Sequence, residues 1–154
     1  MEPNQDKNFV FNVEKIYIKD VSYEAPSVPM AFQTQNAAAE IGVQLGMEHG
    51  LLNAEQGIHE VVLTVTANAT HENKNIFLVE VKQAGIFRIT GLEGETLKRA
   101  LEISCANVLL PFVREAVNEL VSKGGFPQLL INPINFEALY EQKQAAQTRP
   151  VSVN

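Results

Sequence analysis

Polar and apolar residues alternate with a period of two along four stretches of the chain, and this alternation predicts four β-strands. The predicted strands cover residues 9–24, 40–47, 58–69 and 75–90. In the first of them the apolar side chains move from odd to even positions near Glu14. Because a shift of one residue turns every following side chain to the other face, we expect a β-bulge at this point.

Two connecting segments interrupt this alternation. Residues 25–39 contain Pro26 and Pro29 and predict a long loop with little regular structure, and loops of this length are more often functional than idle. Residues 70–74 predict a turn.

The apolar spacing changes to the period of a helix after the fourth predicted strand. Helices are expected over residues 94–103 and 107–123, with Asn107 as the N-cap of the second. Pro111 then falls in the first turn, where its missing N–H does little harm, and the glycine pair 124–125 ends the helix.

A last helix is expected to begin at Asn135, which is a favoured N-cap residue, and to end before the polar tail that starts at Gln144. Residues 1–8 and 144–154 are polar and are expected to be flexible parts of a single domain, 1–154. Strands followed by helices predict an α+β fold with a four-stranded antiparallel sheet.

The helix predicted over residues 107–123 is apolar over a wider arc than contact with one sheet requires. Its apolar residues form two neighbouring seams, one with Leu109, Phe112, Ala116 and Leu120, the other with Leu110, Val113, Val117 and Val121. A second layer on the far side explains this width. In a chain of this length a second subunit is the economical source of that layer, so we expect self-association.

Composition narrows the possible functions. The chain has 154 residues, 45% of them hydrophobic, and a formal net charge of −6, which disfavours non-specific binding of nucleic acid and suits a basic partner. It has no apolar run long enough for a membrane span of about 18 residues, and no secretory signal at its beginning. Its single cysteine cannot form an intrachain disulfide, and together these features favour the cytoplasm.

Candidate residues for chemistry are few. His49, His59 and His71 lack the close spacing of a metal site, and Cys105 has no CxxC partner and is expected to be a buried, inert thiol. Residues 91–96 place glycines before a helix but lack the Walker lysine and the GxGxxG spacing. We therefore expect no catalytic residue, no metal and no cofactor.

Two sets of residues are candidates for binding surfaces. Asp20, Glu24 and Glu80 are expected on solvent-facing strand positions, where charge normally serves solubility; Leu78 beside Glu80 instead suits an acidic patch with an apolar anchor. The second set can be ordinary core, or can line a groove for extended apolar segments between the second strand, the 25–39 loop and the last helix. It consists of Ile41, Val43, Leu45, Phe136, Leu139 and Tyr140.

Three blocks of the sequence resemble the SecB family of bacterial protein-export chaperones. They are FNVEKIYIKDVSYEAPSVP (11–29), IFLVEVKQAGIFRITGLEGE (76–95) and CANVLLPFVREAVNELVSKGGFPQLLINPINFEALY (105–140), and they follow one another in the family's order. The resemblance implies an ATP-independent cytoplasmic holdase that binds unfolded precursor proteins and delivers them to SecA. It also implies a homotetramer, a dimer of dimers, in which the long helix packs between sheets.

The resemblance assigns a role to each candidate residue. It implies a SecA-binding surface formed by Asp20, Glu24, Leu78 and Glu80. It implies a client groove formed by Ile41, Val43, Leu45, Phe136, Leu139 and Tyr140. With the long helix, it implies a tetramer interface formed by Val79, Val81, Gln83, Leu109, Phe112, Val113, Ala116 and Leu120.

The chain departs from the family pattern at three places. It lacks the tryptophan that some relatives carry in the loop after the EAP motif, Gly42 and Gln44 replace charged residues familiar on the second strand, and its C-terminal tail is not the acidic tail of some members. The last departure puts an auxiliary contact between the tail and SecA in doubt.

Two other functions remain open from the sequence. One is an oligomeric enzyme that acts on acyl chains held in the groove, although no carboxylate pair or histidine is placed to serve it. The other is a SecB-like chaperone dedicated to one client, such as the toxin of a toxin–antitoxin system.

Overall fold

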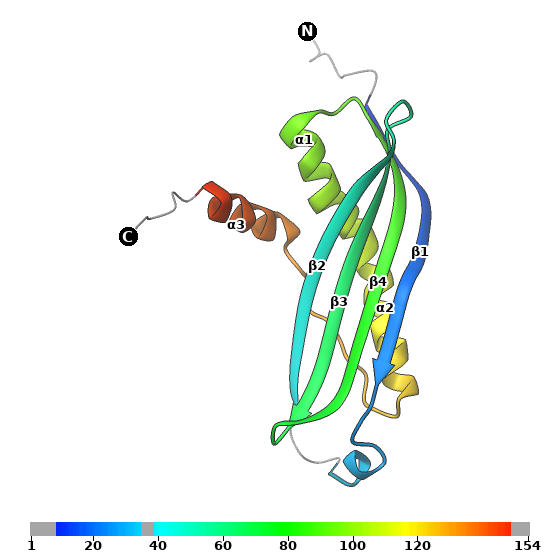
Figure 1. Cartoon of the computed structure of the whole chain (residues 1–154), viewed down its shortest axis with the longest axis vertical. Helices are drawn as coiled ribbons and strands as arrows, with labels where there is room; N and C mark the ends of the chain where they lie inside the picture. The colour runs from blue at the N-terminus through cyan, green and yellow to red at the C-terminus, as the bar shows by residue number, and fades with distance from the viewer. Residues whose placement is uncertain (1–8, 35–38, 149–154) are drawn as a thin grey trace.

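Four long strands form one antiparallel sheet in the computed structural model, which describes residues 9–34 and 39–148 (Figure 1). The strands are β1 (Val10–Glu24), β2 (Glu40–Asn53), β3 (Ile58–His71) and β4 (Lys74–Thr90). Their order in the sheet is β1-β4-β3-β2, so β1 and β2 are the edge strands. The α+β fold with a four-stranded antiparallel sheet is therefore confirmed, although β2 runs six residues beyond the expected end at residue 47.

The β-bulge expected in the first strand is present. The register between β1 and β4 shifts between Val13 and Lys15, and a second shift lies between Ile18 and Asp20. We call the face of the sheet that packs against the helices the inner face. On both sides of each shift, β1 keeps apolar side chains on this face. Phe11 lies on this face, and its ring centroid is 5.9 Å from that of Phe87. The bulges thus reconcile the changed parity of the sequence with one continuous strand.

The predicted break before Asn107 is wrong. A short helix α1 (Gly94–Arg99) continues without interruption through a π-helical turn, η2 (Ala100–Ser104), into the long helix α2 (Cys105–Lys123). Asn107 lies inside α2 rather than at its start. The wider π turn takes up the change of phase that the sequence shows as a gap between two helices.

Pro111 consequently lies in a helix interior instead of a first turn. Its missing N–H leaves the carbonyl of Asn107 without an intrahelical donor. Both residues are exposed, so water can reach that carbonyl and satisfy it.

The core lies between α2 and the inner face of β3 and β4 (Figure 1). Leu109, Val113, Val117 and Val121 are all fully buried, so the seam against the sheet contains Leu109, which the sequence had placed beside Phe112. Gly85 allows the close approach, because a Cβ there would lie 3.2 Å from Leu109 Cδ2. The other seam stays accessible: Phe112 is 43% exposed.

The last helix, α3 (Phe136–Thr148), lies on the β2 side of the sheet (Figure 1). Its predicted N-cap is confirmed, since the Ala138 amide donates to Asn135 Oδ1 at 3.0 Å. Arg99 fastens it to α1, with Nη2 3.0 Å from Glu137 Oε1 and the guanidinium 5.0 Å from the Tyr140 ring centroid. The helix runs beyond the expected end near residue 144; residues 149–154 lie outside the described part.

The 25–39 segment contains more structure than predicted. A 3-10 helix, η1 (Met30–Thr34), forms within it, and Ser27 Oγ donates to the Asn75 carbonyl at 2.6 Å, which ties the segment to β4. Residues 35–38 lie outside the description. None of the helices in the described ranges is long and apolar enough to cross a membrane.

Candidate functional site

The inner face of the edge strand β2 is apolar and uncovered. Ile41, Val43 and Leu45 lie opposite positions of β3 that are at most 1% exposed, and so they point to the same side as the core. They are nevertheless 46%, 41% and 37% exposed. Because α2 covers only β3 and β4, a strip of three branched side chains remains open on the side where the protein is otherwise packed.

One end of this strip opens into a cavity of about 420 Å³ between β2 and α3. The structure brings five of the six predicted groove residues together in its wall, namely Val43, Leu45, Phe136, Leu139 and Tyr140. Phe136 and Tyr140 are buried and form a fixed apolar base, whereas Leu139 is 43% exposed at the rim. The side chains can therefore take up an apolar group without a rearrangement of the core.

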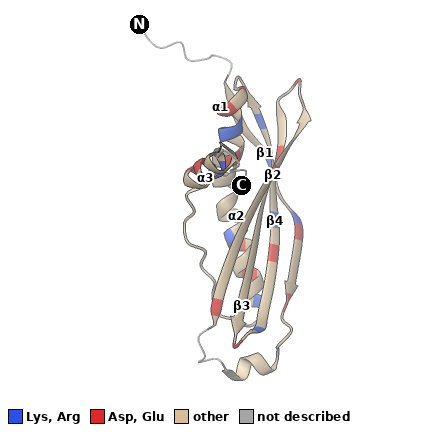
Figure 2. Cartoon of the chain, turned by 60° about the vertical axis from the view of Figure 1, so that its left-hand side comes forward, with Lys and Arg blue, Asp and Glu red and all other residues tan. Residues whose placement is uncertain are grey.

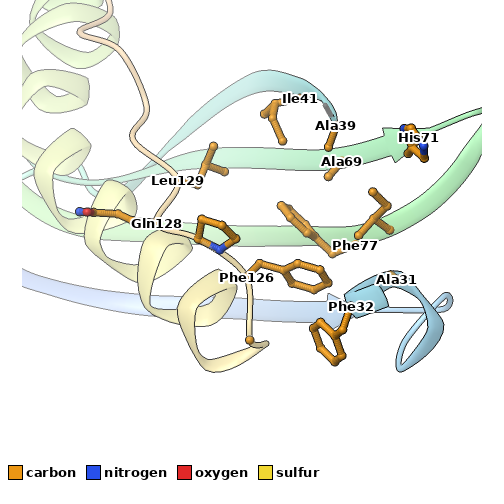
Figure 3. Close-up of a pocket in the computed structure, with 13 residues that line it drawn as sticks. Ala31, Phe32, Ala39, Ile41, Ala69, His71, Phe77, Phe126, Gln128 and Leu129 are labelled. Atoms are coloured by element: carbon orange, nitrogen blue, oxygen red, sulfur yellow. The ribbon is translucent and has the colours of Figure 1, made fainter. Parts of the chain in front are cut away.

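The sixth predicted residue, Ile41, lines a larger cavity of about 660 Å³ (Figure 3). Three phenylalanines from distant segments meet in its wall: Phe32 of η1, Phe77 of β4 and Phe126 after α2. The Phe126 ring centroid is 5.2 Å from each of the other two. Such a cavity suits a large apolar or aromatic side chain.

This aromatic cavity is the part of the site that the sequence did not reveal. Gly125 has a φ of +87°, which a side chain would strain, and this turn brings Phe126 back toward the sheet after α2. A Cβ at Gly125 would also lie 3.1 Å from the Phe32 ring. The glycine pair that ends α2 was therefore a signal for the turn. The neighbouring sequence, however, contains no signal for the contacts of Phe126 with Phe32 and Phe77.

Two of the residues considered for chemistry, Cys105 and His59, line neither of these two cavities. Burial raises the pKa of the Cys105 thiol to about 12, so it remains protonated at neutral pH. Burial, and then the charge of His49, lower the pKa of His59. Within the described residues no group of three or more His, Cys, Asp or Glu could hold a metal ion.

The predicted acidic residues come together on the opposite, outer face of the sheet. In the register of β1 with β4, Asp20 lies opposite Lys82 and Glu24 opposite Leu78, and Ser22 faces Glu80 between them. Figure 2 shows acidic positions on these two strands. Leu78 is 40% exposed, and Glu80 accepts a hydrogen bond from Thr66 Oγ1 at 3.0 Å. An accessible apolar side chain is thus flanked by carboxylates.

The predicted interface residues separate into two groups. Five of them lie inside the chain, each at most 3% exposed: Val79, Val81, Gln83, Leu109 and Val113. Their side chains are covered by the chain itself in this fold, so a role for them in assembly stays a prediction. Phe112, Ala116 and Leu120, on the accessible seam of α2, are the ones that a partner can reach.

Comparison with known proteins gives a consistent result. A family described as "Preprotein translocase subunit SecB" matches residues 4–147. "Protein-export protein SecB" of Chromobacterium violaceum is 46% identical over 147 residues, covering 96% of each chain. The protein of that name from Methylobacillus flagellatus is 40% identical over 145 residues, covering 94% of this chain and 90% of its own.

A solved structure supports the same fold. It is the SecB-like chaperone of Mycobacterium tuberculosis in complex with a ChAD peptide from an antitoxin. The TM-score is 0.68 at 13% sequence identity, over 80% of this chain and 90% of the other.

Proposed function

Because the chain belongs to the SecB family, we propose that it is an ATP-independent holdase that keeps unfolded precursor proteins competent for export and delivers them to SecA. The observation that carries this proposal is the uncovered apolar strip Ile41–Val43–Leu45 with a cavity at each end. We propose the cytoplasm as its location. We also propose that the smaller cavity has no catalytic role, because its carboxylate, Glu102, is paired with Lys143 rather than with a second carboxylate or a histidine.

The strip suits an extended, unfolded segment for two reasons. Alternate side chains of β2 project from the inner face at regular intervals, and a bound segment in the extended conformation projects its own side chains with the same period. The two cavities then receive apolar side chains that a folded precursor would keep in its own core. Selectivity follows from timing, because a fast-folding protein buries these side chains before it is captured.

Assembly would multiply the number of grooves. We propose that Phe112, Ala116 and Leu120 pack against another copy and form a homotetramer, a dimer of dimers. An exposed apolar seam on a long helix is a common subunit contact. Weak contacts of one long client with several grooves add through effective concentration, so that tight capture needs no nucleotide.

Delivery to SecA would use the outer face. Asp20, Glu24 and Glu80 around Leu78 suit a basic partner with an apolar contact point. This surface and the groove lie on opposite faces of one sheet, so SecA can bind while a client is still held. Release then follows from competition for the client.

The first test is the molar mass by light scattering, with and without a slow-folding precursor diluted from denaturant. We expect a tetramer whose mass increases by that of the unfolded chain and which ignores the same precursor after folding. A species that never takes up the unfolded chain would contradict the holdase proposal.

Reversal of one charge should affect SecA binding and client binding differently. We expect Glu80→Lys to weaken SecA binding about tenfold, because it places a cation where a basic partner is received, and to leave client affinity unchanged. Calorimetry with each ligand measures both effects. Glu48→Lys is the matched control, since Glu48 is an exposed outer-face residue on the other edge strand. Equal losses of both ligands in Glu80→Lys would refute the assignment.

A further inference from the structure

We propose that Glu102 is a specificity-determining residue of the smaller cavity, where its carboxylate receives a cationic side chain of the bound client segment. The proposal rests on the holdase function proposed above, and it states which client side chains the groove favours, namely cationic ones. It concerns a residue that the sequence did not single out.

Glu102 occupies an unusual position for a charged residue. It lies in the π-helical turn η2, is only 8% exposed, and contributes to the wall of the 420 Å³ cavity together with Val43 and Leu45. Single π turns are frequent at functional sites, where they aim one side chain away from the regular helical course. The turn therefore places a carboxylate in a cavity whose other walls are largely apolar.

Only one of the two carboxylate oxygens is satisfied. Oε1 accepts from Lys143 Nζ at 3.0 Å, whereas Oε2 is inaccessible to solvent and has no hydrogen-bond partner among residues 9–34 and 39–148. A buried acceptor without a donor is unfavourable, and for a charged group the cost is larger than for a neutral one. A cation that takes the place of Lys143 beside this carboxylate can relieve that cost by supplying the missing donor.

The chemistry of that acceptor selects a cation. A carboxylate only accepts hydrogen bonds, and a guanidinium presents parallel N–H donors that match both of its oxygens. The Lys143 side chain is 53% exposed, so its ammonium can move into solvent while a client cation takes its place beside the buried Glu102 carboxylate. A client arginine in its place can contact Oε1 and Oε2 together, and a client lysine can supply the donor that Oε2 lacks.

An alternative role for Glu102 is purely structural. In that case the ion pair with Lys143 only fastens α3 to η2, and its loss weakens every client equally. The two roles differ in the effect of removing Lys143. If Glu102 receives client cations, the loss of its internal competitor strengthens their binding, whereas loss of a fastening weakens it.

The test uses two synthetic peptides with the same apolar extended sequence, one with a central arginine and one with its uncharged isostere citrulline. Fluorescence anisotropy gives both affinities for the full-length protein. We expect the parent protein to prefer arginine about tenfold, which corresponds to about 1.4 kcal/mol. In Glu102→Gln this ratio should fall to about one while the affinity for the citrulline peptide is unchanged, and in Lys143→Met the ratio should rise.

The control is Glu55→Gln, which removes the same charge from an exposed turn between β2 and β3 and should leave the ratio as in the parent. A parent protein that binds both peptides equally, or a ratio that survives in Glu102→Gln, would overturn the proposal and leave the holdase function intact. If neither peptide binds the parent protein, the holdase function itself is contradicted. Should Glu102→Gln fail to fold, a lowered ratio in Lys143→Met overturns the proposal alone.

Discussion

Val81→Arg should lower the free energy of unfolding by about 3 kcal/mol or more, a large share of the roughly 5–15 kcal/mol of a typical domain. Val81 is fully buried on the inner face of β4, between Val21 of β1 and Val65 of β3. A guanidinium there has neither water nor a carboxylate to pair with. If the proposed tetramer is also lost, the burial of Val81 attributes that loss to damage to the protomer rather than to a direct contact.

Urea denaturation measures this effect, with light scattering of the same samples for the molar mass. Val21→Arg is the matched control: it makes the same substitution on the same face of the neighbouring strand, at a position that is 40% exposed. We expect it to cost less than about 1 kcal/mol. A Val81→Arg protein that unfolds like the parent, yet forms dimers, would restore a direct interface role for Val81.

The double variant Leu45→Asp, Leu139→Asp should weaken capture of an unfolded precursor about a hundredfold. The two leucines face the same cavity from β2 and α3, and each is partly exposed, so the fold should tolerate the change. Contact with an apolar client side chain is worth about 1.5 kcal/mol for each leucine, and together this gives two powers of ten. Two carboxylates that must be desolvated on binding add to the loss.

Suppression of precursor aggregation and calorimetric titration both report this capture. The control is Leu51→Asp, Leu52→Asp, which adds the same charges farther along β2, where the leucines are 58% and 56% exposed and line neither cavity. It should bind clients nearly as well as the parent. A similar loss in both double variants would show that added negative charge, and not the cavity, decides capture.

The sheet was predictable from the sequence because alternation records which face of a strand is buried. The parity change near Glu14 even located the bulge, since the register does shift between Val13 and Lys15. The helical half was less predictable. Asn107 and Pro111 give a local signal for a helix start, but the continuous packing of α1, η2 and α2 keeps the chain helical through this point.

The candidate site was predicted in part for a related reason. The β2 strip and the start of α3 are recognisable from short-range pattern, and the structure places five of those residues around one cavity. The Phe32, Phe77 and Phe126 cluster depends on contacts between segments far apart in the chain, which periodicity does not encode. Likewise, the apolar character of Val81 and Leu109 predicted that both side chains are packed. It did not predict that they are packed within one protomer.

The π turn also limits how this protein can change by insertion or deletion. A π turn accommodates one residue more than an α turn, so loss of a single codon within residues 100–104 leaves an unbroken, fully α-helical path. Because the π turn holds its extra residue within nearly the same rotation as an α turn, α1 and α2 keep their relative orientation after this loss. Arg99 then still faces Glu137 and Tyr140. A shortened gene of this kind keeps the attachment of α3 to α1, and what it changes is the local course of the chain around Glu102, which lies in the π turn.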